Sequence, residues 1–151
     1  MSDDTRVTQW IGSTSIQLAL ISYCYRTIQR RFASDLAPYH IGWGHFAILM
    51  SVYDEEGQSQ DSLALSRGFD KTMIAKSVVK LEEEGLICRE ADPSDKRVKR
   101  LYPTAAGMKL KPELQKIGYA ISRDVFTGMD DEEAVVALAC LRKMAFNAAE
   151  L

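Results

Sequence analysis

Residues 70–104, DKTMIAKSVVKLEEEGLICREADPSDKRVKRLYPT, contain two patterns that together define the architecture of the chain. In the first pattern, Asp70 can cap a helix from Lys71 to about Glu84, because its carboxylate accepts hydrogen bonds from the first turn's unpaired amides. One side of this helix is apolar and the other is basic: Ile74, Val78 and Leu81 against Thr72, Lys76 and Lys80. Gly85 then ends the helix.

The second pattern is a β-hairpin. After Gly85, two short strand-like runs, residues 86–89 and 98–102, flank a polar turn at residues 92–95. The tip and the return strand carry four cations within five positions: Lys96, Arg97, Lys99 and Arg100.

Helical patterns surround these two elements. Ser59 is the expected N-cap of a short helix that ends near Gly68, and two short helices joined by a turn containing glycine are typical of a helix-turn-helix. The other predicted helices cover about 8–37, 43–53 and 104–126, and a last helix follows Gly128, where Asp130 and Glu133 have capping-box spacing.

Charge is distributed unevenly along the 151 residues. The net charge is -2, yet residues 67–111 hold eleven Lys or Arg against seven Asp or Glu, whereas each flank holds four against seven. A basic centre between acidic flanks is typical of a chain of which one part faces a polyanion.

Several classes of protein are disfavoured. The three cysteines are far apart, so no disulfide framework or cysteine zinc site is expected. The N-terminus lacks the pattern of a signal peptide, and no apolar run is long enough to span a membrane, so a cytoplasmic protein is expected. None of the common catalytic motifs occurs, so we expect no enzyme, no catalytic residue, no metal and no cofactor.

The basic helix face and the hairpin tip predict binding to double-stranded DNA. An α-helix fits the major groove, where residues near its start meet base edges, and an arginine at a hairpin tip can enter the minor groove. The candidate DNA-binding residues are Ser59, Gln60, Lys71, Thr72, Met73, Lys76, Lys80, Lys96, Arg97 and Lys99. For Lys76 and Lys80 alone, a merely solvated helix face is the more natural interpretation, and the neighbouring basic hairpin shifts the balance toward DNA.

Asp95 has two interpretations as well. It is either a turn residue or the partner of Arg89 on the facing strand, in which case it fixes the hairpin and keeps Arg97 available for DNA.

The run from Leu81 to Arg89, the following Asp92-Pro93-Ser94-Asp95-Lys96-Arg97, and then Leu101, Thr104 and Gly107 resemble the signature of the MarR family of transcriptional regulators. The resemblance implies a mainly α fold with a small β-hairpin wing, that is, a winged helix-turn-helix with N- and C-terminal dimerisation helices. The whole chain, 1–151, would form a single domain, with a core at about 41–103 and dimerisation helices at about 8–37 and 104–149. Lys71 to Glu84 would be the recognition helix, and Asp95 and Arg97 the wing pair.

The resemblance also implies a partner and a ligand. Apolar stripes on the terminal helices predict a homodimer, which would read a pseudo-palindromic operator with half-sites about 34 Å apart. Similar regulators respond to small aromatic acids, for which the candidate pocket residues are Tyr25, Arg26, His40, Trp43 and Phe46. An ordinary core with partly exposed histidines is the more common explanation of such a cluster. We therefore expect a repressor that a small aromatic ligand releases from DNA. The alternatives are a winged-helix module that binds proteins and a redox-sensing regulator that acts through Cys24.

Overall fold

A computed structural model describes residues 16–68 and 70–150, and the chain divides into two compact units, Met1–Trp43 and Gly44–Leu151. In the first unit, helix α2 (Ile16–Leu36) is followed by a short 3-10 turn, η1 (Ala37–Tyr39). The helix ends close to the predicted residue, where Ala37 and Pro38 change the α-helix into the 3-10 turn. Its predicted start near residue 8 lies outside the described residues.

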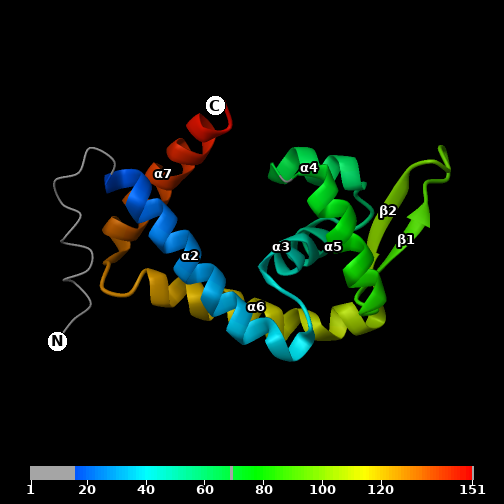
Figure 1. Ribbon diagram of the computed structural model, residues 1–151, viewed down its shortest axis with the longest axis horizontal. Helices are drawn as coiled ribbons and strands as arrows, with labels where there is room; N and C mark the ends of the chain where they lie inside the picture. Colours follow the sequence, from blue (N-terminus) through cyan, green and yellow to red (C-terminus); the bar gives the residue numbers. More distant parts are fainter. Residues whose placement is uncertain (1–15, 69, 151) are drawn as a thin grey trace. The chain divides into compact units, whose positions relative to one another are not determined.

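The second unit contains the helix-turn-helix and the hairpin (Figure 1). Its elements, beginning at the junction of the two units, are α3 (Trp43–Asp54), α4 (Gln60–Arg67), α5 (Lys71–Glu83), β1 (Ile87–Ala91), β2 (Lys99–Pro103), α6 (Ala105–Val125) and α7 (Asp131–Ala148). Helix α4 packs on α5, and the hairpin lies beside both of these helices, as Figure 1 shows. This arrangement is a helix-turn-helix followed by a wing, as predicted.

The predicted helix caps are confirmed. Ser59 accepts a hydrogen bond from the Ser62 amide, and Asp70 accepts one from the Met73 amide. At the start of α7, Asp130 and Glu133 bond each other's backbone amides and form a capping box. These bonds fix where each helix begins.

The core of the second unit comes from the apolar faces of α3, α4, α5, β2 and α6. The fully buried residues of this unit are Ile48, Leu49, Val52, Leu63, Ile74, Val78, Leu81, Leu101 and Leu114. The predicted apolar side of α5 therefore faces inward, and its opposite side faces solvent. The polar residues of α5 are therefore accessible from solvent.

The two strands pair in antiparallel register, from Ile87 opposite Pro103 to Ala91 opposite Lys99. Helix α6 begins directly after the hairpin, where Thr104 caps it by accepting from the Gly107 amide. The Thr104 hydroxyl also donates to the Gly85 carbonyl over 2.6 Å. The end of α5, the base of the hairpin and the start of α6 thus form one joined region.

Among the described residues, no helix combines the length and the apolar character that crossing a membrane requires.

Candidate nucleic-acid interface

Helix α5 presents a polar surface at its N-terminal end. Asp70 Oδ1 accepts from the Met73 amide over 2.9 Å and holds the first turn in place. Thr72 and Lys76 are exposed and Met73 is partly exposed, while Ile74, Ser77 and Val78 are buried beneath them. The residues predicted to meet base edges therefore lie on the solvent side of a firmly anchored helix.

The other two lysines of this helix are engaged in ion pairs. Lys71 Nζ lies 2.7 Å from Asp61 Oδ1 on α4, and both side chains are largely exposed. Lys80 pairs with Glu84 one turn further along, and its position is only partly exposed. Burial and the nearby Lys80 lower the pKa of His45, which keeps its imidazole neutral at pH 7. Lys76 is thus the α5 lysine that, among the described residues, carries its charge without an ion pair.

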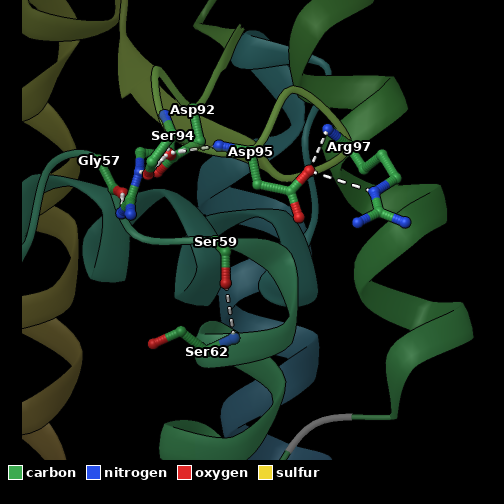
Figure 2. A network of polar contacts seen from close by, with 8 residues as sticks. Gly57, Ser59, Ser62, Asp92, Ser94, Asp95 and Arg97 are labelled. Carbon is green, nitrogen blue, oxygen red and sulfur yellow. Dashed lines mark hydrogen bonds and ion pairs between the residues drawn. The ribbon is translucent and has the colours of Figure 1, made fainter.

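The wing tip is held by a short set of local bonds (Figure 2). Asp92 Oδ1 accepts from the Ser94 amide over 2.8 Å, from the Ser94 hydroxyl over 2.5 Å and from the Asp95 amide over 3.2 Å. Bonds from the Ser94 hydroxyl and amide, followed by those from Arg100 and the Asp95 amide, hold the pKa of Asp92 well below its usual range. Asp92 therefore remains an anion throughout the physiological pH range.

Arg97 projects from this tip, and its side chain is 91% exposed. Asp95 Oδ1 accepts from the Arg97 amide over 3.0 Å and from Arg97 Nε over 3.2 Å. Among the described residues, the two terminal guanidinium nitrogens form no hydrogen bond, and Figure 2 draws bonds to Asp95 only from the backbone amide and Nε. Lys96 and Lys99, next to Arg97, are exposed as well.

The expected pair between Arg89 and Asp95 is wrong. Arg89 Nη2 lies 2.5 Å from Glu82 Oε2 on α5, and Asp95 bonds Arg97 instead. The register explains the difference, because Arg89 is opposite Leu101, well below the tip that holds Asp95. A carboxylate in a tight turn reaches the backbone two residues ahead more easily than the facing strand.

A shallow cleft joins the wing to the start of α4. Its volume is about 350 Å³, and its lining residues are Ser59, Gln60, Asp61, Arg97, Val98 and Lys99. Gln60 Nε2 is buried there and, within the described part of the chain, has no hydrogen-bond partner. The structure therefore brings together four of the predicted DNA-binding residues: Ser59, Gln60, Arg97 and Lys99.

Two of the predicted ligand-pocket residues lie on α2, and a third follows the 3-10 turn. Tyr25 and Arg26 are exposed on α2 and bond Gln29 and Ser22 of the same helix. His40 is exposed with a left-handed backbone, φ 56°.

The other two are aromatic residues at the start of α3. The Trp43 ring lies 4.6 Å from the Phe32 ring, measured between centroids. Phe46 is buried, and its ring faces Gly118 of α6.

The sequence analysis did not anticipate the contacts of three residues of the hairpin and its surroundings: Asp92, Arg100 and Tyr53. Asp92 and Arg100 form an ion pair at the base of the wing tip. The Tyr53 hydroxyl donates to the Gly107 carbonyl, and burial raises its pKa to about 12. The signal available for Asp92 was its place before Pro93 and Ser94, which is typical of a turn whose carboxylate bonds the following amides.

A helix-turn-helix with its polar recognition face exposed, next to a basic hairpin, defines a winged-helix DNA-binding protein. Comparison with known proteins identifies the family. The family model described as MarR family matches residues 41–99. The HTH-type transcriptional regulator YybA of Bacillus subtilis is 31% identical over 104 residues, which are 69% of each chain. The chain belongs to the MarR family of transcriptional regulators.

Solved structures agree with this assignment. A MarR transcriptional regulator from Methanosarcina mazei has a TM-score of 0.83 at 33% identity and covers 91% of this chain and 99% of its own. Two structures at 22% identity share the fold. One is a MarR-family regulator from Listeria monocytogenes in complex with a 26mer DNA, with a TM-score of 0.83 over 88% of this chain and 89% of that one. The other is Bordetella bronchiseptica BpsR, whose DNA binding is regulated by 6-hydroxynicotinic acid, with a TM-score of 0.80 over 88% and 96%.

Proposed function

We propose that this MarR-family regulator is a cytoplasmic homodimeric repressor that binds a pseudo-palindromic operator through α5 and the wing and leaves it when a small aromatic ligand binds. One observation carries the proposal: Thr72 and Lys76 of α5 and Arg97 of the wing are exposed on elements that pack together. Cations from two neighbouring elements can then approach a single duplex.

The individual contacts follow from the geometry of each residue. Thr72, Met73 and Lys76 would meet base edges in the major groove, because they lie on the exposed side of α5 near its N-terminus. Arg97 would enter the minor groove, whose negative potential attracts guanidinium.

Phosphates would take the remaining residues. The cleft between the wing and α4 is lined by Gln60 and Lys99, and the exposed Lys99 ammonium would bind one backbone phosphate there. Ser59 lines the same cleft, and Lys71, Lys80 and Lys96 would contribute charge nearby, Lys71 and Lys80 by exchanging a carboxylate for a phosphate.

The dimer is supported by α7. This helix of 18 residues buries none of them within the chain, although most of the stability of a protein helix comes from packing of its apolar face. Its exposed apolar residues are Val135, Val136, Leu138, Leu141, Met144 and Phe146. A second copy would cover such a surface and place two recognition helices on one face of DNA.

The effector part of the proposal rests on the kinds of side chain that the sequence supplies. Tyr25, His40, Trp43 and Phe46 have aromatic rings, and Arg26 is a cation that would pair with a carboxylate. The response of BpsR to 6-hydroxynicotinic acid supports this chemical class for a protein of the same fold. An effector acts only through its different affinities for the DNA-bound and released states.

Fluorescence anisotropy with duplexes from the DNA flanking the gene tests the proposal. Arg97→Ala and Lys76→Ala should each weaken binding by about 1–3 kcal/mol while the fold remains intact. Lys116→Ala, which removes an exposed cation from α6, is the matched control and should leave the affinity unchanged. Equal affinities for wild type and Arg97→Ala would refute the wing role, and absence of any DNA binding would favour a protein-binding module.

A redox response through Cys24 is the second candidate, because this thiol is exposed on α2. An accessible thiol can react with oxidants, whereas a buried one is inert. The rate at which iodoacetamide labels the native protein at neutral pH distinguishes a reactive, accessible thiol from an inert one. Slow labelling of Cys24, relative to the exposed Cys140, would eliminate the redox sensor.

A further inference from the structure

Asp92 lies at the point where β1 ends and the wing tip begins, and its side chain is only 6% exposed. One carboxylate oxygen, Oδ1, accepts hydrogen bonds from the Ser94 amide, the Ser94 hydroxyl and the Asp95 amide, and it thereby organises the tip. The other oxygen, Oδ2, accepts from Arg100 Nε on β2. A single buried carboxylate therefore ties the tip loop to the return strand.

Arg100 continues this connection to the helix-turn-helix. Its Nη1 donates to the Gly57 carbonyl over 2.7 Å, in the loop between α3 and α4. The backbone of Arg100 also forms an isolated antiparallel bridge with Ser59, the N-cap of α4. Arginine suits this place because its planar guanidinium can hold two acceptors in fixed directions, which a lysine ammonium cannot do.

Gly57 has a left-handed backbone, which strains any residue with a side chain. Its φ is +80°, and an added Cβ would lie 2.9 Å from the Tyr102 hydroxyl oxygen on β2. The Gly57 amide donates to the Leu101 carbonyl over 2.8 Å, and the Leu101 amide donates to the Gln58 carbonyl over 3.0 Å. The loop before α4 is thus attached to β2 along three consecutive residues, with Arg100 nearest to the tip.

We propose that Asp92 and Arg100 are the positioning pair of the wing: the pair locks the tip against the start of α4 and thereby fixes where Arg97 meets DNA. The connection runs from the Gly57 carbonyl through Arg100 and Asp92 to the Asp95 amide, and Asp95 in turn holds Arg97 (Figure 2). The proposal takes the place of the incorrect Arg89–Asp95 pair, and it rests on the proposed role of Arg97 in DNA binding.

The pair has a role distinct from that of the other ion pair of the hairpin. Arg89 and Glu82 join β1 to α5 and involve no residue of the tip. Loss of that pair should leave Arg97 in place, whereas loss of the Asp92–Arg100 pair should leave the tip attached by the backbone alone. Glu82→Gln is therefore a matched control that removes one ion pair from the same hairpin.

A double-mutant cycle on DNA affinity tests the proposal. The variants are Arg100→Lys, Asp92→Asn, Arg97→Ala, the combination Arg100→Lys with Arg97→Ala, and the control Glu82→Gln. Anisotropy titrations measure the DNA affinity of each variant, and the protein concentration is corrected for the folded fraction measured by circular dichroism. Arg100→Lys and Asp92→Asn should each weaken binding about five- to twentyfold, and Glu82→Gln less than about twofold. In the Arg97→Ala background, Arg100→Lys should add less than about twofold, because the residue that it positions is absent.

Hydroxyl-radical footprinting supplies a readout that a general loss of stability would not change. Arg100→Lys should lose hydroxyl-radical protection of the sugars along the minor groove at the outer edges of the site, and it should retain protection of guanine N7 in the major groove from dimethyl sulfate. Additive effects of Arg100→Lys and Arg97→Ala, or a uniform weakening of the footprint, would overturn the proposal. A result in which Arg97→Ala itself leaves binding unchanged would refute the wing's role in DNA binding, a failure that is distinguishable from that of the positioning pair. Arg100→Lys retains the charge at a side chain that is 41% exposed, so the test stands even if Asp92→Asn does not fold.

Discussion

Replacement of Gly107 by alanine should destabilise the fold by about 2 kcal/mol, because the start of α6 touches the backbone of the wing there. A Cβ on Gly107 would lie 2.1 Å from the Leu86 carbonyl oxygen. Carbon and oxygen in ordinary contact are about 3.2–3.5 Å apart, so α6 and the hairpin base would have to separate by about 1 Å. A carbonyl of the backbone cannot turn aside as the end of a side chain can.

The size of the effect follows from the bonds that this separation stretches. They are the bonds from the Thr104 amide to Leu86, 3.1 Å, from the Thr104 hydroxyl to Gly85, 2.6 Å, and from the Tyr53 hydroxyl to Gly107, 2.5 Å. Loss of three hydrogen bonds costs about 1.5–4.5 kcal/mol, and alanine returns up to about 1 kcal/mol through its higher helix propensity. The net loss is then about 2 kcal/mol.

Urea denaturation followed by circular dichroism, at one fixed protein concentration, measures this loss. Gly118→Ala is the control within the same helix, since its Cβ would lie 3.1 Å from Phe46 Cζ, the far end of a side chain that can move. We expect Gly118→Ala to change the free energy of unfolding by less than about 1 kcal/mol. If Gly107→Ala were as stable as the wild type, the close contact between α6 and Leu86 would be wrong.

Three further predictions concern the recognition helix, the buried tyrosine and the charge of the interface. Asp70→Ala should destabilise α5 by about 1 kcal/mol, because it removes the acceptor of the Met73 amide. A much smaller loss of unfolding free energy in urea denaturation would contradict the cap. The free energy of unfolding should fall between about pH 10 and 12, since Tyr53 keeps its proton in the folded state up to a pKa of about 12 while the unfolded chain loses it near 10; Tyr53→Phe should lack this decline. If each protomer neutralises about four phosphates, the logarithm of the DNA-binding constant should fall with the logarithm of salt concentration with a slope near -7, and a slope near zero would exclude a phosphate interface.

Local signals in the sequence were sufficient for most of the fold. Ser59, Asp70, Thr104 and Asp130 each stand directly before a helix, and a cap acts within one turn, so its effect can be read from neighbouring residues. The change from helical to strand spacing after Gly85 predicted the hairpin for the same reason.

Contacts between residues that lie on different elements were harder to predict from the sequence. Glu82 and Asp95 both lie close to Arg89 in the sequence. Only the structure, with the register of the hairpin, shows that Arg89 pairs with Glu82. The contact between Arg100 and the Gly57 carbonyl joins residues 43 positions apart and depends on a backbone acceptor, which no side-chain pattern marks. The network that organises the wing is therefore visible only in three dimensions.

The most direct test of the account is a selection of bound duplexes from a random DNA library, followed by hydroxyl-radical footprinting of the enriched sequence with wild type, Lys76→Ala and Arg97→Ala. We predict an inverted repeat whose half-site centres are about 10 bp apart. Protection of guanine N7 in the central major grooves from dimethyl sulfate should weaken in Lys76→Ala, and hydroxyl-radical protection of the outer minor grooves should disappear in Arg97→Ala. Recovery of no common sequence, or of a single unpaired half-site whose footprint both variants leave unchanged, would contradict DNA recognition by two copies of α5 and its wing.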